Sequence, residues 1–295
     1  MDRQKQMVVA QAIASGSVSR ALVAIDSALM GETGKHWIRD LNKLRDLVQD
    51  KDCSPRFSIL IQGNTKLSFL SYSELPIVTC PGAGECAEFC YSLKAFRYPA
   101  AFCRMAQNTW LRQKPSGRAH IEDSFSSYCD YAEYWGETID FRLFVDGDFA
   151  DSESVDFWMG LIKSKPILKA YGYSKSFKLL TNWQKNGGQF PSNYTLNMSS
   201  GHNASQALIK AAADLPITRG DFIAVQTPTK WKNADYGSAA YNRELVDTYK
   251  AETGKKAFPC PGKCDSCRMV KGKNVHACGD SSAKMRGLDI IIAMH

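Results

Sequence analysis

The chain has 295 residues, of which 44% are hydrophobic and 23% are charged, the composition of a soluble globular protein with one large domain or two ordinary ones. Its formal net charge of +7 permits contact with nucleic acid or an acidic partner without demanding it. The N-terminus is polar and no apolar run approaches the length of a membrane span. Both features argue against a secreted or membrane protein, so we expect a cytoplasmic one.

Residues 1–52 are predicted to form a helical N-terminal appendage. Apolar side chains recur at helical spacing between Val8 and Leu29, and the pattern returns between Trp37 and Leu47. No motif that supports chemistry occurs in this segment. We therefore expect a helical cap that packs on the main domain, and the alternative is an arm that binds a partner or regulates the protein.

Residues 53–295 alternate between strand and helix patterns. Strands are predicted over residues 57–64, 66–72, 75–78, 141–145, 169–174, 194–199, 222–226 and 288–293, and helices over residues 100–113, 120–134, 152–163, 204–213 and 242–253. Such alternation predicts an α/β fold with a parallel sheet of about six core strands, in a partial or complete parallel β/α barrel. Ligand sites in these folds lie at the carboxyl ends of the strands.

A cysteine loop follows the strand predicted at 75–78. Cys80, Cys86 and Cys90 are separated by five and then three residues. Three close thiolates bind soft metals, and as ligands of a four-iron cluster they leave one iron open to another molecule. A fourth protein ligand from elsewhere, or three buried thiols in a turn, are the alternatives. Free cysteines do not usually cluster in this way, so we favour a metal site.

A second set of cysteines lies in a predicted metal-binding segment, residues 258–280. Cys260, Cys264, Cys267 and Cys278 can close a tetrahedral zinc site or hold a 4Fe–4S cluster, and His276 can replace one of them. In a reducing compartment such a set is more typical of metal binding than of disulfides. The other three cysteines are isolated and are expected to be small buried residues: Cys53, Cys103 and Cys129.

Basic residues surround this second set: Lys255, Lys256, Lys263, Arg268, Lys271 and Lys273. Such charge is more often a solvated face than a nucleic-acid groove. The basic C-terminal region is nevertheless the best candidate for nucleic-acid contact in this chain.

Polar residues follow three further predicted strands. Asp146-Gly147-Asp148 comes after the strand at 141–145, Ser174 ends the next, and Ser199 ends the one after that. Because the carboxyl ends of parallel strands share one rim, these residues should gather there with the cysteine loop. A glycine between two carboxylates lets the backbone turn towards a ligand, and the carboxylates can accept an ammonium or a ribose hydroxyl. The alternative is a simple turn that caps the next helix.

The chain resembles the gene product 88 family of phages and other mobile elements, over roughly residues 57–295 and not over the first fifty. The resemblance rests on residues 60–67, 75–76, 79–83, 86, 90–93, 96–99, 108, 144–149 and 171–176. That family in turn resembles radical S-adenosylmethionine (SAM) enzymes.

The second resemblance implies a β/α barrel in which Cys80, Cys86 and Cys90 hold three irons of a 4Fe–4S cluster and SAM chelates the fourth. Its remaining cofactor-binding residues would be Phe89 and Tyr91 beside the last cysteine, Asp146, Gly147 and Asp148 at the cofactor's amino group, and Ser174 and Ser199 near its ribose or carboxylate. The four C-terminal cysteines would resemble an auxiliary cluster.

Two functions follow from these patterns. The first is an iron–sulfur enzyme that cleaves SAM to a radical, which abstracts hydrogen from an unknown substrate. The second is a non-enzymatic, metal-stabilised effector of a mobile element that binds host or rival-plasmid machinery or nucleic acid. The helical N-terminus and the basic C-terminal region motivate the second function.

Overall fold

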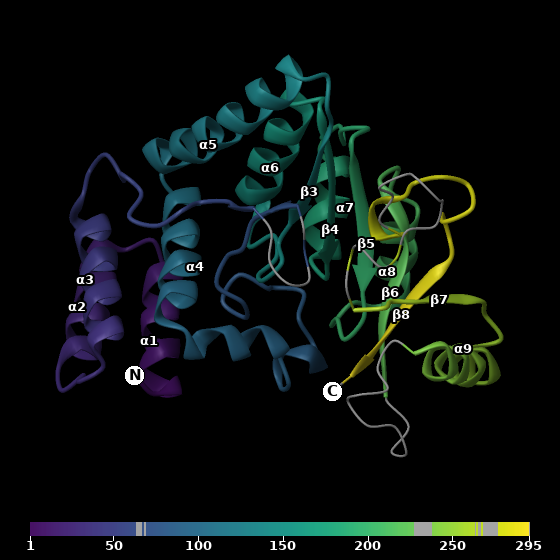
Figure 1. The fold of residues 1–295 in the computed structure, drawn as a ribbon, viewed down its shortest axis with the longest axis horizontal. Helices are drawn as coiled ribbons and strands as arrows, with labels where there is room; N and C mark the ends of the chain where they lie inside the picture. The colour runs from purple at the N-terminus through teal and green to yellow at the C-terminus, as the bar shows by residue number, and fades with distance from the viewer. Residues whose placement is uncertain are drawn as a thin grey trace.

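An eight-stranded sheet forms the centre of the protein (Figure 1). The computed structural model describes residues 1–62, 67, 69–226, 238–262, 264, 267 and 277–294. Its strands are β1 (Ile61–Gln62), β2 (Leu70–Ser71), β3 (Ile139–Leu143), β4 (Leu168–Ser174), β5 (Tyr194–Ser199), β6 (Thr218–Gln226), β7 (Ala257–Pro259) and β8 (Asp289–Met294), in the spatial order β1-β2-β3-β4-β5-β6-β8-β7.

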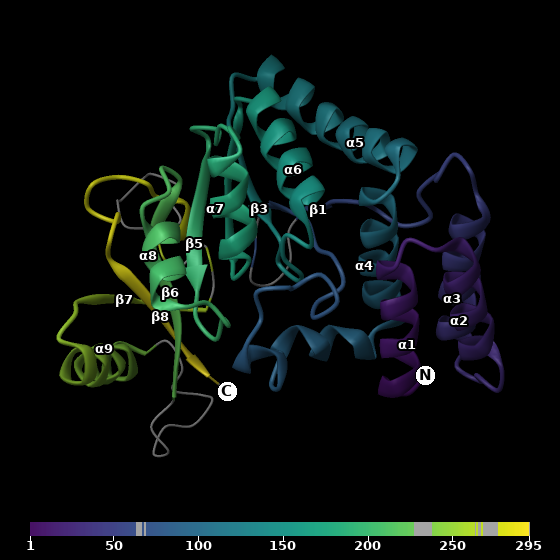
Figure 2. The ribbon, with the colours of Figure 1, turned by 180° about the vertical axis from the view of Figure 1, so that it is seen from behind.

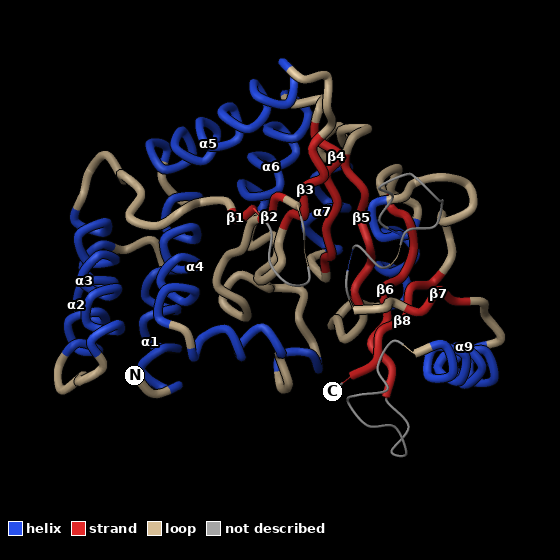
Figure 3. Tube along the Cα trace, viewed as in Figure 1, coloured by secondary structure: helices blue, strands red, loops and turns tan. Residues whose placement is uncertain are grey.

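Helices precede the sheet and alternate with its strands (Figure 3). They are α1 (Arg3–Ala14), α2 (Val18–Leu29), α3 (Lys35–Gln49), α4 (Pro99–Arg112), α5 (Pro115–Tyr134), α6 (Ser152–Ser164), α7 (Phe177–Lys185), α8 (Gln206–Ala213) and α9 (Ala239–Thr253), with short 3₁₀ helices at Glu85–Ala87, Tyr91–Arg97 and Ala277–Gly279. No helix of the described ranges is long and apolar enough to cross a membrane.

The pairing of the strands confirms a mixed α/β protein with a mostly parallel sheet. Every neighbouring pair from β2 to β7 is parallel, and β1 pairs with β2 in antiparallel fashion. β1 and β7 are the edge strands, and no pairing joins them within the described part of the chain. Closure of the sheet into a barrel therefore stays a prediction.

The prediction of a strand at residues 75–78 is wrong. Ile77 adopts a φ of +70°, which no strand accommodates, and the Leu75 N–H donates to the hydroxyl of Thr109 instead of to a neighbouring strand. The strand before the cysteine loop is β2. Backbone hydrogen bonds from Tyr72 and Glu74 prolong its contact with the β3 segment, so the chain still enters the loop at the carboxyl end of the sheet.

The two faces of the sheet are covered differently. On one face, Phe141 and Leu143 of β3 share a hydrophobic core with Trp158 of α6, and Figure 2 shows α6, α7 and α8 along this side. On the opposite face, Tyr171 and Tyr173 of β4 pack against the C-terminal cysteine segment. The period-two alternation of strand side chains explains why neighbouring residues serve different cores.

The first three helices pack together against α4. Leu44 of α3 and Trp110 of α4 belong to the same hydrophobic core as Phe141 and Leu143 of β3. The Gln6 side chain of α1 donates to the carbonyl of Phe96, 3.0 Å away, in the segment just after Cys90. The helical character of residues 1–52 is thus confirmed, and a boundary at residue 52 stays a prediction.

Candidate functional site at the carboxyl ends of the strands

The cysteine loop is held to the turn after β5 by its backbone. The N–H of Gly84 donates to the carbonyl of Gly201 at 2.9 Å, and the N–H of Cys86 donates to the same carbonyl at 3.3 Å. The N–H of Asn203 donates back to the carbonyl of Gly82 at 3.1 Å. Main-chain bonds therefore fix the loop whatever its cysteine side chains bind.

The glycines of the loop allow this close approach. A Cβ atom at Gly82 would overlap the carbonyl group of Lys175, at the end of β4, and a Cβ atom at Gly84 would lie 2.8 Å from the carbonyl of His202. Only glycine fits such backbone-to-backbone contacts. The Pro-Gly-Ala-Gly sequence thus serves to seat the loop tightly across the ends of β4 and β5.

Cys90 lies close enough to Cys80 and to Cys86 to influence both thiols electrostatically. Burial raises the pKa of Cys80 to about 12, and the neighbouring Asp148 and Cys90 contribute to the rise. Burial also raises the pKa of Cys86, which Lys175 opposes and Cys90 supports. Among the residues that the structure describes, no three His, Cys, Asp or Glu side chains are already arranged as a metal site. Burial thus favours the neutral thiol at Cys80 and at Cys86.

Asp148 and Ser174 are engaged within the protein. The buried carboxylate of Asp148 accepts from the N–H of Phe149 at 2.8 Å, the hydroxyl of Ser174 at 2.7 Å and the N–H of Lys175 at 2.7 Å. Ser174 also accepts from the N–H of Ser176. These bonds tie the turn after β3 to the end of β4, so a structural role for both residues stands beside the predicted cofactor contact.

Asp146 accepts fewer hydrogen bonds from the protein than Asp148 does. Its carboxylate accepts from the hydroxyl of Ser73 at 3.2 Å and from that of Ser92, and it lies near Arg142 and Arg104. Burial raises its pKa, whereas those two hydroxyls and the two arginines oppose the rise. Of the two predicted carboxylates, Asp146 has the greater remaining capacity to accept a hydrogen bond from a ligand.

Gly147 is required where it stands, for steric reasons. It has a φ of +86°, and a Cβ atom there would lie 2.9 Å from the Thr79 hydroxyl and 3.1 Å from Cβ of Glu74. The carboxylate of Glu74 is fully buried and accepts from Nε of Arg112 at 3.0 Å. Burial raises the pKa of Glu74, and Arg112 opposes the rise, so this arginine favours the charged form of a carboxylate whose side chain lies against Gly147.

Lys175 is a cation of the site to which the sequence assigns no role. Its ammonium donates to the hydroxyl of Ser199 at 2.8 Å and lowers the pKa of both Cys80 and Cys86 against the effect of their burial. The sequence feature that indicates such a role is the position of Lys175 directly after the strand that ends at Ser174, at the predicted rim. Ser199 is therefore in the site, where it positions this lysine.

The two aromatic residues beside Cys90 have largely exposed side chains, but the hydroxyl of Tyr91 is buried near Ser92 and Arg142, and this burial raises its pKa. Phe89 is 56% exposed and Tyr91 is 63% exposed, an unusual state for large apolar rings in a well-packed protein. Both lie on the loop that bears the three cysteines. A flat ligand could cover them at the open end of the sheet.

The second set of cysteines lies against the face of the sheet that α6 does not cover. Cys267 and Cys278 are buried, Cys260 and Cys264 are partly buried, and all four pack in the cluster that contains Tyr171. Burial raises the pKa of Cys278 to about 12 and that of Cys260 to about 11. The carbonyl of Cys278 accepts from the side-chain amide of Asn197 at 2.9 Å. The sheet therefore supports this set directly.

Much of the predicted basic region lies outside the described residues: Lys263, Arg268, Lys271, Lys273 and the candidate ligand His276. Of the remaining lysines, Lys255 has its ammonium 3.5 Å from Asp289 and 3.9 Å from Asp221. This lysine is thus paired with acidic groups of the protein.

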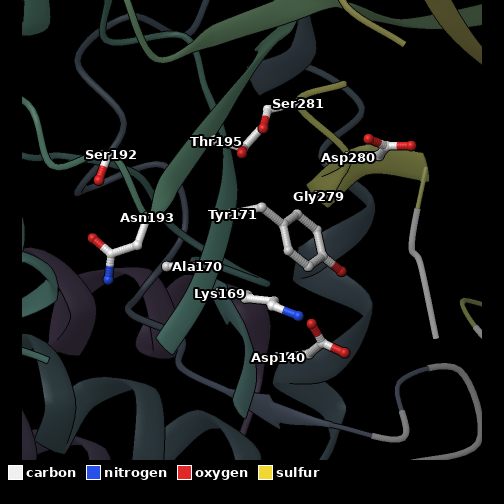
Figure 4. A pocket seen from close by; sticks show the side chains of 10 residues that line it. All are labelled: Asp140, Lys169, Ala170, Tyr171, Ser192, Asn193, Thr195, Gly279, Asp280 and Ser281. Carbon is white, nitrogen blue, oxygen red and sulfur yellow. The ribbon is translucent and has the colours of Figure 1, made fainter. Parts of the chain in front are cut away.

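A cavity of about 290 Å³ opens at the other end of the strands. It is lined by Asp140, Lys169, Ala170, Tyr171, Ser192, Asn193, Thr195, Gly279, Asp280 and Ser281 (Figure 4). None of the predicted site residues lines it. Tyr171 and Gly279 separate it from the C-terminal cysteines, so it borders the second set and is remote from the loop.

Comparison with family models identifies the chain. The model of the gene product 88 family matches residues 44–284, most of the sequence. The chain belongs to the gene product 88 family. The match begins earlier than the expected residue 57 and includes the end of α3, so the first fifty residues are not wholly outside the family. Comparisons of this family member with curated proteins and with solved structures found no match.

Proposed function

We propose that this protein is an iron–sulfur protein in which Cys80, Cys86 and Cys90 hold a 4Fe–4S cluster at the carboxyl end of the sheet. The observation that supports the proposal is the gathering of three thiols on one loop fixed across β4 and β5. All donors are thiols, which suit an iron–sulfur cluster, and three of them leave one iron for another ligand.

The proposed ligand of that iron is SAM, by analogy with the radical SAM enzymes that the family is expected to resemble. When bound, such a cluster supplies the electron that cleaves the sulfonium bond of SAM. A β/α barrel is the closed or partly closed form proposed for the parallel sheet. The C-terminal cysteines would hold a second 4Fe–4S cluster or a zinc ion, since four thiolates suit either.

The residues at the rim would orient the cofactor. Asp146 would accept a hydrogen bond from its ammonium, because Asp148 already accepts three hydrogen bonds from the protein. Phe89 and Tyr91 would cover an apolar part of the cofactor and exclude water there. Lys175 would balance the negative charge of the thiolates that form when a metal displaces their protons.

Anaerobic purification followed by counting of iron, sulfide and zinc per chain tests the proposal. We expect iron and sulfide in the intact protein and release of 5′-deoxyadenosine when the reduced protein meets SAM. Cys86→Ala should lose the iron of the loop, whereas Cys103→Ala, at a buried cysteine of α4, should keep it. Zinc without sulfide, or iron unchanged in Cys86→Ala, would overturn the assignment and favour a non-enzymatic, metal-stabilised effector.

A further inference from the structure

Three aromatic side chains are exposed together at the C-terminal end of α5. Tyr131 is 67% exposed, Tyr134 is 81% exposed and Trp135 is 60% exposed. Their rings contact one another: the ring centroid of Trp135 lies 5.2 Å from that of Tyr134 and 6.4 Å from that of Tyr131. A grouped set of exposed rings is typical of an interaction site, because folding normally buries most of such side chains. We call these three residues the aromatic patch.

The backbone gives the aromatic patch a defined geometry. Gly136 adopts a φ of +64°, and its N–H donates to the carbonyl of Glu133 at 3.1 Å. The N–H of Glu137 donates to the carbonyl of Ala132 at 2.9 Å. These two hydrogen bonds form the Schellman motif that ends many helices. The exposed rings therefore project from a capped helix end and not from a frayed one.

The surroundings of the aromatic patch are acidic. From residue 119 to residue 141 the chain has six Asp or Glu residues and no Lys or Arg, although its net charge is +7. Asp130, Glu133 and Glu137 lie between or beside the rings in the sequence and are exposed. None of these three carboxylates forms a salt bridge with another described residue. Lys165 lies near the same turn, but its ammonium donates to a serine hydroxyl of α5 at 2.9 Å.

The aromatic patch lies at the opposite end of the sheet from the cysteine loop. β3 begins at Ile139, shortly after the helix end, so the patch is at the amino end of the parallel strands, whereas the loop is fixed across their carboxyl ends. Figure 1 and Figure 2 both show the end of α5 at the top edge of the molecule. A partner can therefore occupy the patch without covering the proposed metal site of the loop.

The rings and the carboxylates together favour a cationic partner. The face of an indole or phenol ring attracts a guanidinium group, and a carboxylate can accept two hydrogen bonds from the same group. Among the described residues, no cation lies over any ring of the patch. The same carboxylates would repel the phosphates of a nucleic acid and the headgroups of an anionic membrane.

We propose that the aromatic patch, with Asp130 and Glu133 and Glu137 around it, is a docking surface for an arginine-rich segment of another protein. The rings supply most of the affinity because they stack on guanidinium groups and exclude water from the contact. The carboxylates direct the approach of the partner. This surface uses none of the residues assigned to either metal site, so the inference is independent of the proposed function.

Fluorescence anisotropy with the full chain and a labelled peptide of alternating arginine and leucine tests the proposal. Trp135→Ala combined with Tyr134→Ala should weaken binding about tenfold or more, because truncated aromatic anchors cause losses of this size. Asp130→Asn combined with Glu133→Gln and Glu137→Gln should weaken binding at low salt and reduce its dependence on salt. The matching lysine peptide should bind more weakly, since an ammonium group does not stack on a ring.

Tyr98→Ala is the matched control. Tyr98 is 57% exposed, but it lies at the start of α4 with the guanidinium of Arg97 over its ring. Its affinity for the arginine peptide should equal that of the parent chain. Circular dichroism verifies that each variant is folded, and if the double alanine variant is not, the carboxylate variant decides the question.

The outcomes that would overturn the inference are distinct. They include no binding of the arginine peptide to the parent chain, and unchanged affinity in the α5 variants. Binding of duplex DNA or of anionic vesicles that is lost in the double alanine variant would assign the surface to another class of partner. A dimer in sedimentation that Trp135→Ala dissociates would show that a second copy of the chain covers the patch. Iron and zinc counts should be the same in all these variants as in the parent chain.

Discussion

The two cysteine sets of this protein are built in opposite ways. The loop of Cys80, Cys86 and Cys90 is fixed by main-chain hydrogen bonds and flanked by exposed aromatic rings. The set that ends at Cys278 lies against the face of the sheet that α6 does not cover, in one cluster with Tyr171 and Tyr173. A three-thiol site at an open rim suits the binding of another molecule, whereas a four-thiol site under cover suits structure or electron relay.

The largest expected difference between the two sets is in stability. Cys278→Ser should lower the free energy of unfolding of the metal-loaded protein by more than about 4 kcal/mol, because loss of metal and loss of packing coincide there. Cys86→Ser should cost about 1 kcal/mol or less, since backbone bonds hold its loop without the thiol. Anaerobic urea unfolding measures both. Equal losses would contradict the distinction between a buried and an open set.

The second prediction concerns the ion pair of Glu74 and Arg112, which lies next to Gly147. Arg112→Met leaves the fully buried Glu74 without its cation and should destabilise the protein by about 3–5 kcal/mol. Because Glu74 packs against Gly147, iron held by the loop should fall as well, while metal at the C-terminal set stays. Adding Glu74→Leu should recover part of the stability. Urea midpoints and metal counts measure these effects, and an unchanged midpoint for Arg112→Met would refute them.

The smallest of the three effects concerns the seating of the loop. Gly82→Ala places a methyl group against the carbonyl of Lys175 and should cost about 1–3 kcal/mol, with loss of iron from the loop alone. Gly160→Ala, in α6 where no atom approaches, is the control and should be neutral or stabilising by up to about 1 kcal/mol. Thermal unfolding and iron content decide the matter. Full iron content in Gly82→Ala would show that the loop tolerates displacement.

The parallel sheet could be predicted from the sequence because its strands are short apolar runs between helical patterns. Residues 194–199 were predicted as a strand and form β5 with the same bounds. The strand predicted at 141–145 ends early because Phe144 adopts a φ of +55° and turns the chain. Helix α7 was missed, since its nine residues make fewer than three helical turns, too few for the period to stand out in the sequence.

The gathering of the rim residues could also be predicted, because parallel strands end on the same side. The isolated cysteines Cys53, Cys103 and Cys129 are buried, as expected. The cation Lys175 was not given a role. A charged residue just after a strand normally indicates a solvent-facing position, and Lys175 comes near Ser199 and the cysteine loop only through the fold. Its role as a support of the cysteine loop remains a prediction.

The hydrogen bond between the side chain of Gln6 and the carbonyl of Phe96 affects how a deletion of the N-terminal helices should be interpreted. Arg3 also lies over the ring of Phe96, so α1 touches the segment that leaves Cys90 at two points. A deletion of residues 1–52 would remove this support along with any partner-binding surface, and its phenotype would mix the two losses. Substitutions at solvent-facing positions such as Val23, which is 70% exposed, would test for a partner-binding surface while leaving the support of the cysteine loop in place.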